Sequence, residues 1–208
     1  METKIAKIVS ESFFIERTER KVTELKNQIL DATIQVFNKK GIKFTMDDLA
    51  KSLGMSKKTI YTVFSDKNEL FLAMVDYLFD GIKEAQAEII KSEELNLIEK
   101  IKGILNVMPA GYKDIDFRQL YLLKDKYPKI YSQVESRLEN GWEDTFSLLE
   151  EGKKTGVIKD VDIPIVKLMF EASLEQFFQR DILIKNNLTY QDALNEVVEI
   201  LMSGITSV

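Results

Sequence analysis

The spacing of Ala50, Gly54 and Ile60 constrains the fold of this 208-residue chain more than any other feature. Two short helices that cross need a small residue where they touch and a residue tolerant of positive φ in the turn between them. They also need an apolar residue that closes the second helix onto the first. The remaining buried positions of such a unit would be filled by Leu49, Leu53, Met55 and Val63. Residues 45–64 therefore predict a helix-turn-helix.

Capping residues set the boundaries expected for the helices around this unit. An apolar stripe begins at Val22, recurs every three or four residues and ends at Gly41. Thr45 and Ser56 have the character of N-caps for the two short helices. Ser65, with Glu69 four positions later, predicts the start of a long fourth helix that runs to about residue 91.

Beyond residue 70 every readable pattern is helical. The chain has only 3 Pro and 9 Gly, which permits long helices and disfavours a turn-rich β architecture. We expect an all-α protein of about nine helices, with an N-terminal extension over 1–21, a three-helix head over 22–70 and a larger helical domain over 71–208. The helices expected in the larger domain, after the one that continues from the head, cover 94–107, 113–125, 129–152, 163–184 and 189–203. The extension is either a helical arm or a frayed tail.

Two missing residue types restrict the chemistry. The chain has no Cys and no His, so thiolate nucleophiles, disulfides and the commonest general base and metal ligand are unavailable. Residues 152–155 lack the earlier glycine of a phosphate-binding loop and are interpreted as a turn. We therefore expect no catalytic residues, no metal and no cofactor. No signal peptide or membrane span is evident, which predicts a cytoplasmic protein.

The net charge of −5 is unevenly distributed. Residues 1–70 carry 13 Lys and Arg and 10 Asp and Glu, a net charge of +3, whereas residues 71–208 carry −8. Within residues 39–67 there are seven Lys and three Asp. A basic head on an acidic body suits a protein that presents one end to phosphate, although surface lysines also cluster by chance.

The head resembles that of TetR-family transcriptional regulators in three segments: GIKFTMDDLA (41–50), LGMSKKTIY (53–61) and FSDKNEL (64–70). The resemblance covers residues 22–72 in detail, and beyond them only length and helical content agree. Two positions depart from the family pattern. Lys58 stands where a small residue is common, and Val63 where an aromatic residue is common, which affects base preference more than fold.

The resemblance implies that residues 56–64 lie in the major groove of double-stranded DNA. Base or near-base contacts are then expected from Lys57, Lys58 and Thr62. Phosphate contacts are expected from Thr45, Ser56, Thr59, Tyr61 and Lys67. A core position is the competing interpretation of Tyr61. Lysine lacks the fixed fork of arginine and is the less discriminating reader of guanine.

The resemblance also implies a homodimer that binds a palindromic operator through the last two helices, at about 163–184 and 189–205. The first of these has hardly any polar face, and an apolar helix of this kind is buried on more than one side. The second carries a stripe of Leu194, Val197, Val198, Leu201 and Ile205. A helix central to a monomeric core is the competing interpretation.

Similar proteins hold a small-molecule effector in the larger domain, and its binding releases the operator. The aromatic candidates for lining such a pocket are Phe117, Tyr121, Trp142, Phe146 and Phe177, each of which could equally be plain core. The sequence thus predicts a ligand-released repressor. The alternatives are an activator or a regulator controlled by a protein partner and, more remotely, a helical adaptor or an enzyme without a DNA role.

Overall fold

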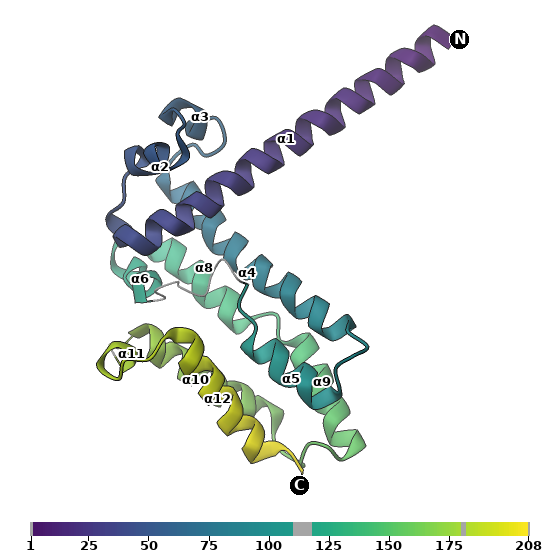
Figure 1. Ribbon diagram of the computed structural model, residues 1–208, viewed down its shortest axis with the longest axis vertical. Coiled ribbons are helices and arrows are strands. Elements are labelled where there is room, and N and C mark those ends of the chain that lie inside the picture. Colours follow the sequence, from purple (N-terminus) through teal and green to yellow (C-terminus); the bar gives the residue numbers. More distant parts are fainter. Residues whose placement is uncertain (1, 110–117, 180–181, 208) are drawn as a thin grey trace. The chain divides into compact units, whose positions relative to one another are not determined.

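The computed structural model describes residues 2–109, 118–179 and 182–207, with side chains over 21–109, 118–178 and 182–207. The chain divides into two compact units, residues 1–74 and 75–208. Figure 1 labels all of the helices described below except α7 and the short turn η1. The described residues are almost entirely helical and form no strand beyond a single antiparallel bridge between Ile158 and Thr206. The all-α prediction is confirmed.

The first unit contains α1 (Glu2–Lys40), a 3-10 turn η1 (Gly41–Lys43), α2 (Met46–Leu53) and α3 (Lys57–Tyr61), and α4 (Lys67–Lys91) begins in it. The segment over 2–20 continues α1 without a break, so the extension belongs to the same helix as residues 22–40. The core of the first unit is a cluster of fully buried side chains from α1, α2, α3 and α4: Ile29, Leu30, Phe37, Leu49, Ile60, Leu70 and Phe71.

The start of α4 differs from the prediction. Asp66, not Ser65, accepts the backbone N–H groups of Asn68 and Glu69, at 2.7 and 2.9 Å, and so caps the helix. Ser65 instead donates its own N–H and hydroxyl to the carboxylate of Glu69, each at 2.6 Å. The capping pattern is present, but it is shared between two neighbouring residues.

The second unit contains the rest of α4 and the helices α5 (Leu97–Asn106), α6 (Arg118–Tyr121), α7 (Leu123–Lys126), α8 (Pro128–Glu139), α9 (Glu143–Thr155), α10 (Ile163–Gln179), α11 (Ile182–Lys185) and α12 (Tyr190–Ile205). α5 packs against α9 and α12, and α10 packs against α6, α9 and α12. α10 and α12 lie side by side in Figure 1.

Predicted boundaries differ most where a long helix was expected. Residues 129–152 are not one helix, because the chain breaks at Asn140–Trp142 and Gly141 adopts a φ of +81°. Over 113–125, the described part divides into α6 and α7. α12 continues through Gly204, the predicted stop, to Ile205, because Gly204 keeps helical geometry and the cap falls on Thr206.

Candidate nucleic-acid interface and ligand pocket

Thr45 begins α2 with a reciprocal cap. Its hydroxyl accepts the N–H of Asp48 at 3.2 Å, and the Asp48 carboxylate accepts the N–H of Thr45 at 2.9 Å. Lys40 also donates to this carboxylate at 2.6 Å. Hydrogen bonds from Lys40 and Thr45 lower the pKa of Asp48 to about 2. The reciprocal cap confirms the predicted start of the helix-turn-helix at Thr45. Because its pKa is lowered, the Asp48 carboxylate stays ionised across the physiological pH range.

Gly54 ends α2 in the left-handed conformation, with a φ of +63°. The N–H of Gly54 donates to Lys51 and that of Met55 to Ala50, which satisfies carbonyl groups at the helix end. Ala50 and Ile60 are buried, as the motif requires. Leu49 is also buried, whereas Leu53, Met55 and Val63, predicted as buried, are only partly so.

Ser56 caps α3 through its hydroxyl, which accepts the N–H of Thr59 at 3.1 Å. The regular helix ends at Tyr61, earlier than the predicted Phe64, but the N–H groups of Thr62, Val63 and Phe64 still donate to carbonyls three or four residues back. The second helix of the motif is thus short, with a final turn that remains hydrogen-bonded.

Six of the eight residues predicted to contact DNA are exposed on the first unit: Thr45, Ser56, Lys57, Lys58, Tyr61 and Thr62. Thr59 is half-buried. The Tyr61 side chain is 46% exposed, so the core interpretation of this residue does not hold. The Thr62 hydroxyl donates to the carbonyl of Thr59 at 2.6 Å, which leaves its oxygen as an acceptor.

Lys57 forms an ion pair with Asp47 across the turn, at 2.9 Å, and the pair raises the pKa of the lysine. Both side chains are largely exposed, so the pair is screened by solvent and exchanges readily for other partners. Lys58 is exposed one residue further along α3.

Lys67, predicted as a phosphate contact, lies against the interior of the head. Its ammonium donates to the carbonyls of Phe44 and of Ile42, the latter at 3.0 Å. It also lies over the rings of Phe44 and Phe71, at 4.2 and 5.1 Å from their centres. Lys67 therefore holds the segment around η1 against the aromatic core, and a phosphate contact by this residue stays a prediction.

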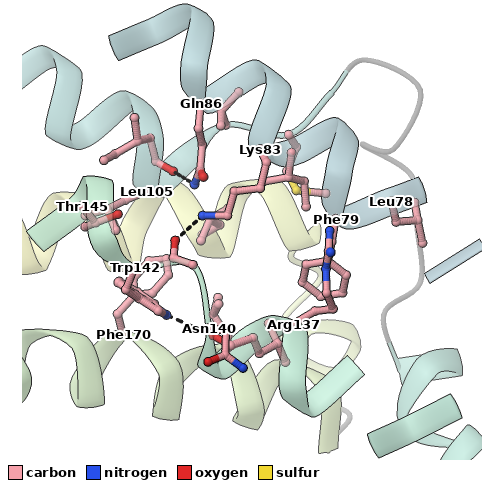
Figure 2. Close-up of a pocket in the computed structure, with 18 of the residues that line it drawn as sticks. Leu78, Phe79, Lys83, Gln86, Leu105, Arg137, Asn140, Trp142, Thr145 and Phe170 are labelled. Carbon is pink, nitrogen blue, oxygen red and sulfur yellow. Dashed lines mark hydrogen bonds between the residues drawn. The ribbon is translucent and has the colours of Figure 1, made fainter. Parts of the chain in front are cut away.

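The second unit contains a partly open pocket of about 120 Å³, lined by residues from α4, α5, α6, α8, α9, α10 and α12. Most of the lining is apolar, and Trp142, the single tryptophan of the chain, is part of it. Two cations also line it, Lys83 and Arg137, and no carboxylate does among the described lining residues. Figure 2 shows both cations with Trp142 around the pocket.

Lys83 joins α4 to the break between α8 and α9. Its ammonium donates to the carbonyl of Gly141, and a Cβ at that glycine would lie only 2.8 Å from Lys83 Cε. Figure 2 shows the lysine side chain reaching this carbonyl beside Trp142. Partial burial lowers the pKa of Lys83, and the nearby Asp144 and Glu143 carboxylates oppose that shift.

Of the aromatic residues predicted to surround a pocket, Trp142 lines this one. The ring centre of Phe146 lies 6.3 Å from that of Trp142, and the ring centre of Phe177 lies 6.1 Å from that of Tyr190. Tyr121 instead packs edge-on against Tyr131. Phe117 lies outside the described residues. None of these three described residues, Phe146, Phe177 and Tyr121, is part of the lining.

Sequence reasoning missed Lys83, Arg137 and Gln86. The available signal was on α4, where Phe79, Ile82, Lys83 and Gln86 follow at three- and four-residue steps. Lys83 and Gln86 therefore lie on the same face of α4 as the apolar Phe79 and Ile82, and an apolar helix face packs against other helices. Arg137 gave no comparable signal, since its partners are brought near only by the fold.

α10 has a buried apolar face and an uncovered one. Val166, Phe170 and Leu174 are buried in the chain's own core, whereas Ile165, Leu168 and Met169 are 52%, 59% and 54% exposed. On α12, Ile200 is 68% exposed. The stripe predicted on α12 is buried or half-buried within the chain: Leu194, Val197, Val198, Leu201 and Ile205. Ile200 is not part of that stripe and contributes to the uncovered apolar surface instead.

Within the described part of the chain, no helix is long and apolar enough to cross a membrane. An all-α chain with a capped helix-turn-helix in one unit and a pocket in a second helical unit has the features of a transcriptional regulator with a DNA-binding head. The likeness to known proteins agrees with this class.

Residues 29–74 match the family model for bacterial regulatory proteins of the tetR family. The chain is 29% identical over 180 residues to the uncharacterized HTH-type transcriptional regulator YvaF of Bacillus subtilis (strain 168), a match that covers 86% of this chain and 95% of the relative. The head therefore carries the DNA-binding domain of tetR-family regulators over residues 29–74, and the chain is similar to such a regulator over most of its length. Family and relatives are regulators, not enzymes.

Two solved structures share the fold. A TetR-family transcriptional regulator from Cytophaga hutchinsonii has a TM-score of 0.67 and 19% identity, over 90% of this chain and 98% of its own. A TetR transcriptional regulator from Chloroflexus aurantiacus J-10-FL has a TM-score of 0.66 and 18% identity, over 90% of this chain and 100% of its own.

Proposed function

We propose that the protein is a homodimeric repressor that binds a palindromic operator with α3 and is released by a small-molecule effector. The observation that carries the proposal is the exposed set at the start of α3, where Ser56, Lys57 and Lys58 follow a capped turn. A helix-turn-helix places the N-terminal residues of its second helix nearest the base edges.

The contacts would divide by chemistry. Lys57 and Lys58 donate to guanine O6 and N7 or to nearby phosphates, and the Thr62 oxygen accepts from a base. Thr45, Ser56 and Tyr61 supply exposed hydroxyls to phosphates. Lys57 exchanges Asp47 for DNA at little cost, because their ion pair is exposed.

Dimerisation is supported by the uncovered apolar surface that Ile165, Leu168 and Met169 of α10 form with Ile200 of α12. Several large apolar side chains exposed on two neighbouring helices are typical of a protein interface. Two copies related by a two-fold axis would cover each other's α10 and α12 and present two heads to inverted half-sites.

Release by a small molecule is supported by the pocket in the second unit. Its walls come from seven helices, so an occupant that favours one arrangement of these helices shifts the population toward it. DNA affinity then falls by the effector's differential affinity for the two states.

Selection of bound duplexes from a random DNA pool tests the proposal. We expect recovery of two inverted half-sites with a fixed spacing, and binding that weakens steeply as salt rises. The Lys57→Ala/Lys58→Ala double variant should bind the selected duplex at least about tenfold more weakly, with a salt slope smaller by about two. The matched control Lys129→Ala, an exposed lysine on α8, should bind as the wild type does. Recovery of single half-sites or of no consensus would overturn the proposal.

A further inference from the structure

The charge of the pocket indicates what kind of molecule fills it. We infer that the effector is a small apolar acid whose carboxylate is bound by Lys83 and whose hydrocarbon part fills the remainder of the pocket. The inference rests on the proposed function, in which this pocket is the effector site, and it adds the chemical class of the effector.

Of the two cations in the lining, only Lys83 is available. The Arg137 guanidinium pairs with Asp80 and lies 3.8 Å from Asp76, and it packs over the ring of Phe79 at 5.6 Å. Its charge is therefore balanced by two carboxylates on α4. Lys83 has no carboxylate within ion-pair distance in the described part of the chain, and its one hydrogen bond there is to the Gly141 carbonyl.

An ammonium in this position favours an anion over a neutral molecule. Lys83 is partly removed from water, and its charge is met only by a neutral carbonyl and by the more distant Asp144 and Glu143. A carboxylate in the pocket would replace a neutral acceptor by a charged one, which adds attraction between opposite charges to the hydrogen bond, and this attraction is stronger where water is partly excluded. An alcohol accepts a hydrogen bond from the ammonium without that attraction, and an ammonium head group is repelled.

The neighbouring polar groups fit one acid head group. The Gln86 amide already donates to the carbonyl of Ile104 at 2.7 Å, so it is occupied. Thr145 lines the same pocket, is 5% exposed, and its hydroxyl has no hydrogen-bond partner among the described residues. Its hydroxyl can donate to the second carboxylate oxygen.

The rest of the wall sets the size and polarity of the ligand. Leu105, Phe170 and Leu194 are among the side chains that make it apolar. The cavity volume of about 120 Å³ approaches the roughly 150 Å³ of an engineered apolar cavity that binds benzene. The hydrocarbon part should therefore contain about six carbons.

Trp142 provides a direct readout, because the only tryptophan of the chain lines the pocket. Its fluorescence is followed while the full-length protein is titrated with hexanoate, hexan-1-ol or hexylamine, three probes that differ only in the head group. We expect a saturable change with hexanoate, weaker binding of hexanol by at least about tenfold, and no saturable change with hexylamine.

Variants of Lys83 identify the group that binds the acid. Lys83→Met should weaken hexanoate by about tenfold or more and hexanol much less, because hexanol loses a hydrogen bond but no attraction between opposite charges. Lys83→Arg keeps the charge and should retain hexanoate preference over hexanol, so the inference remains testable where the methionine variant fails to fold. Lys129→Met is the control and should match the wild type.

Equal affinity for hexanoate and hexanol overturns the inference, as does an unchanged hexanoate affinity in folded Lys83→Met, or the absence of saturable binding by every probe. The titration contains no DNA, so its result is independent of operator binding. If hexanoate binds as expected and fails to release the operator in a gel-shift assay, the proposed release fails while the ligand class stands.

Discussion

Lys57 pairs with Asp47, yet it is also the lysine proposed to approach DNA. The carboxylate competes with phosphate for the ammonium and adds a negative charge to the surface that faces DNA. We therefore expect Asp47 to lower the affinity of the head for any duplex without changing which bases the head prefers.

We expect Asp47→Asn to tighten binding to non-operator DNA by about threefold to tenfold at low salt, with a smaller gain at high salt because of screening. Fluorescence anisotropy over a series of salt concentrations measures this. Asp125→Asn on α7, also an exposed aspartate, should change little. Weaker binding by Asp47→Asn would mean that the ion pair orients Lys57 for DNA.

Asp48 makes the stability of the head depend on pH. Its pKa is lowered from 3.8 to about 2 in the folded chain, so its contribution is complete above pH 3.8 and is lost as pH falls through about 2. Asp48→Asn should lower the Tm at pH 7, and the difference from wild type should shrink between pH 4 and pH 2. Thermal melts followed by circular dichroism measure it. A difference independent of pH would show that the charge of Asp48 is not involved.

At the scale of elements, Gly54 shows how one backbone conformation fixes the angle between two helices. Its φ of +63° lies where side chains with a Cβ are strained, although a Cβ there would meet nothing within 4 Å. A substitution of Gly54 by alanine would therefore introduce backbone strain without a steric clash.

We expect Gly54→Ala to destabilise the protein by about 1 kcal/mol, which lowers the Tm by about 2–4 °C for a chain of this size. Gly204→Ala is the matched control, since a Cβ there also meets nothing within 4 Å but the backbone is helical. It should raise stability by about 0.5–1 kcal/mol. Equal effects of the two substitutions would contradict the assignment to backbone strain.

The features that sequence reasoning predicted are those with local causes. Thr45, Ser56 and Gly54 cap or end helices through atoms within five residues, so their spacing was sufficient. The break at Gly141 had a local signal that sequence reasoning missed, since an Asn-Gly pair marks a turn. Its hydrogen bond with Lys83, 58 positions earlier in the chain, could not be predicted. The same holds for Lys67, whose carbonyl partners Phe44 and Ile42 lie 23 and 25 positions away. A lysine that meets carbonyls of a distant turn has the same sequence signature as one on the surface.

At the scale of the whole molecule, the exposed apolar side chains of α10 give the dimer a test. Leu168→Glu places a charge at a position that is 59% exposed in one chain and would be buried between two. We expect monomers by analytical ultracentrifugation, retained helical circular dichroism, and loss of operator binding by at least about a hundredfold.

The control for this substitution is Val22→Glu, because Val22 is 54% exposed and lies on α1 in the first unit, whereas α10 and α12 belong to the second. It should remain dimeric. A dimeric Leu168→Glu variant would place the interface elsewhere on the chain.

The bridge between Ile158 and Thr206 joins the segment before α10 to the end of α12. The N–H of Lys159 donates to Ile205 at 2.8 Å, the N–H of Ser207 donates to Val157 at 3.0 Å, and the Lys159 ammonium donates to Gly204 at 2.9 Å. The end of α12 cannot leave the segment that precedes α10 without breaking these bonds, so exchange of α12 alone between two copies by domain swapping is disfavoured. The two helices should open together, as one cooperative unit of amide hydrogen exchange.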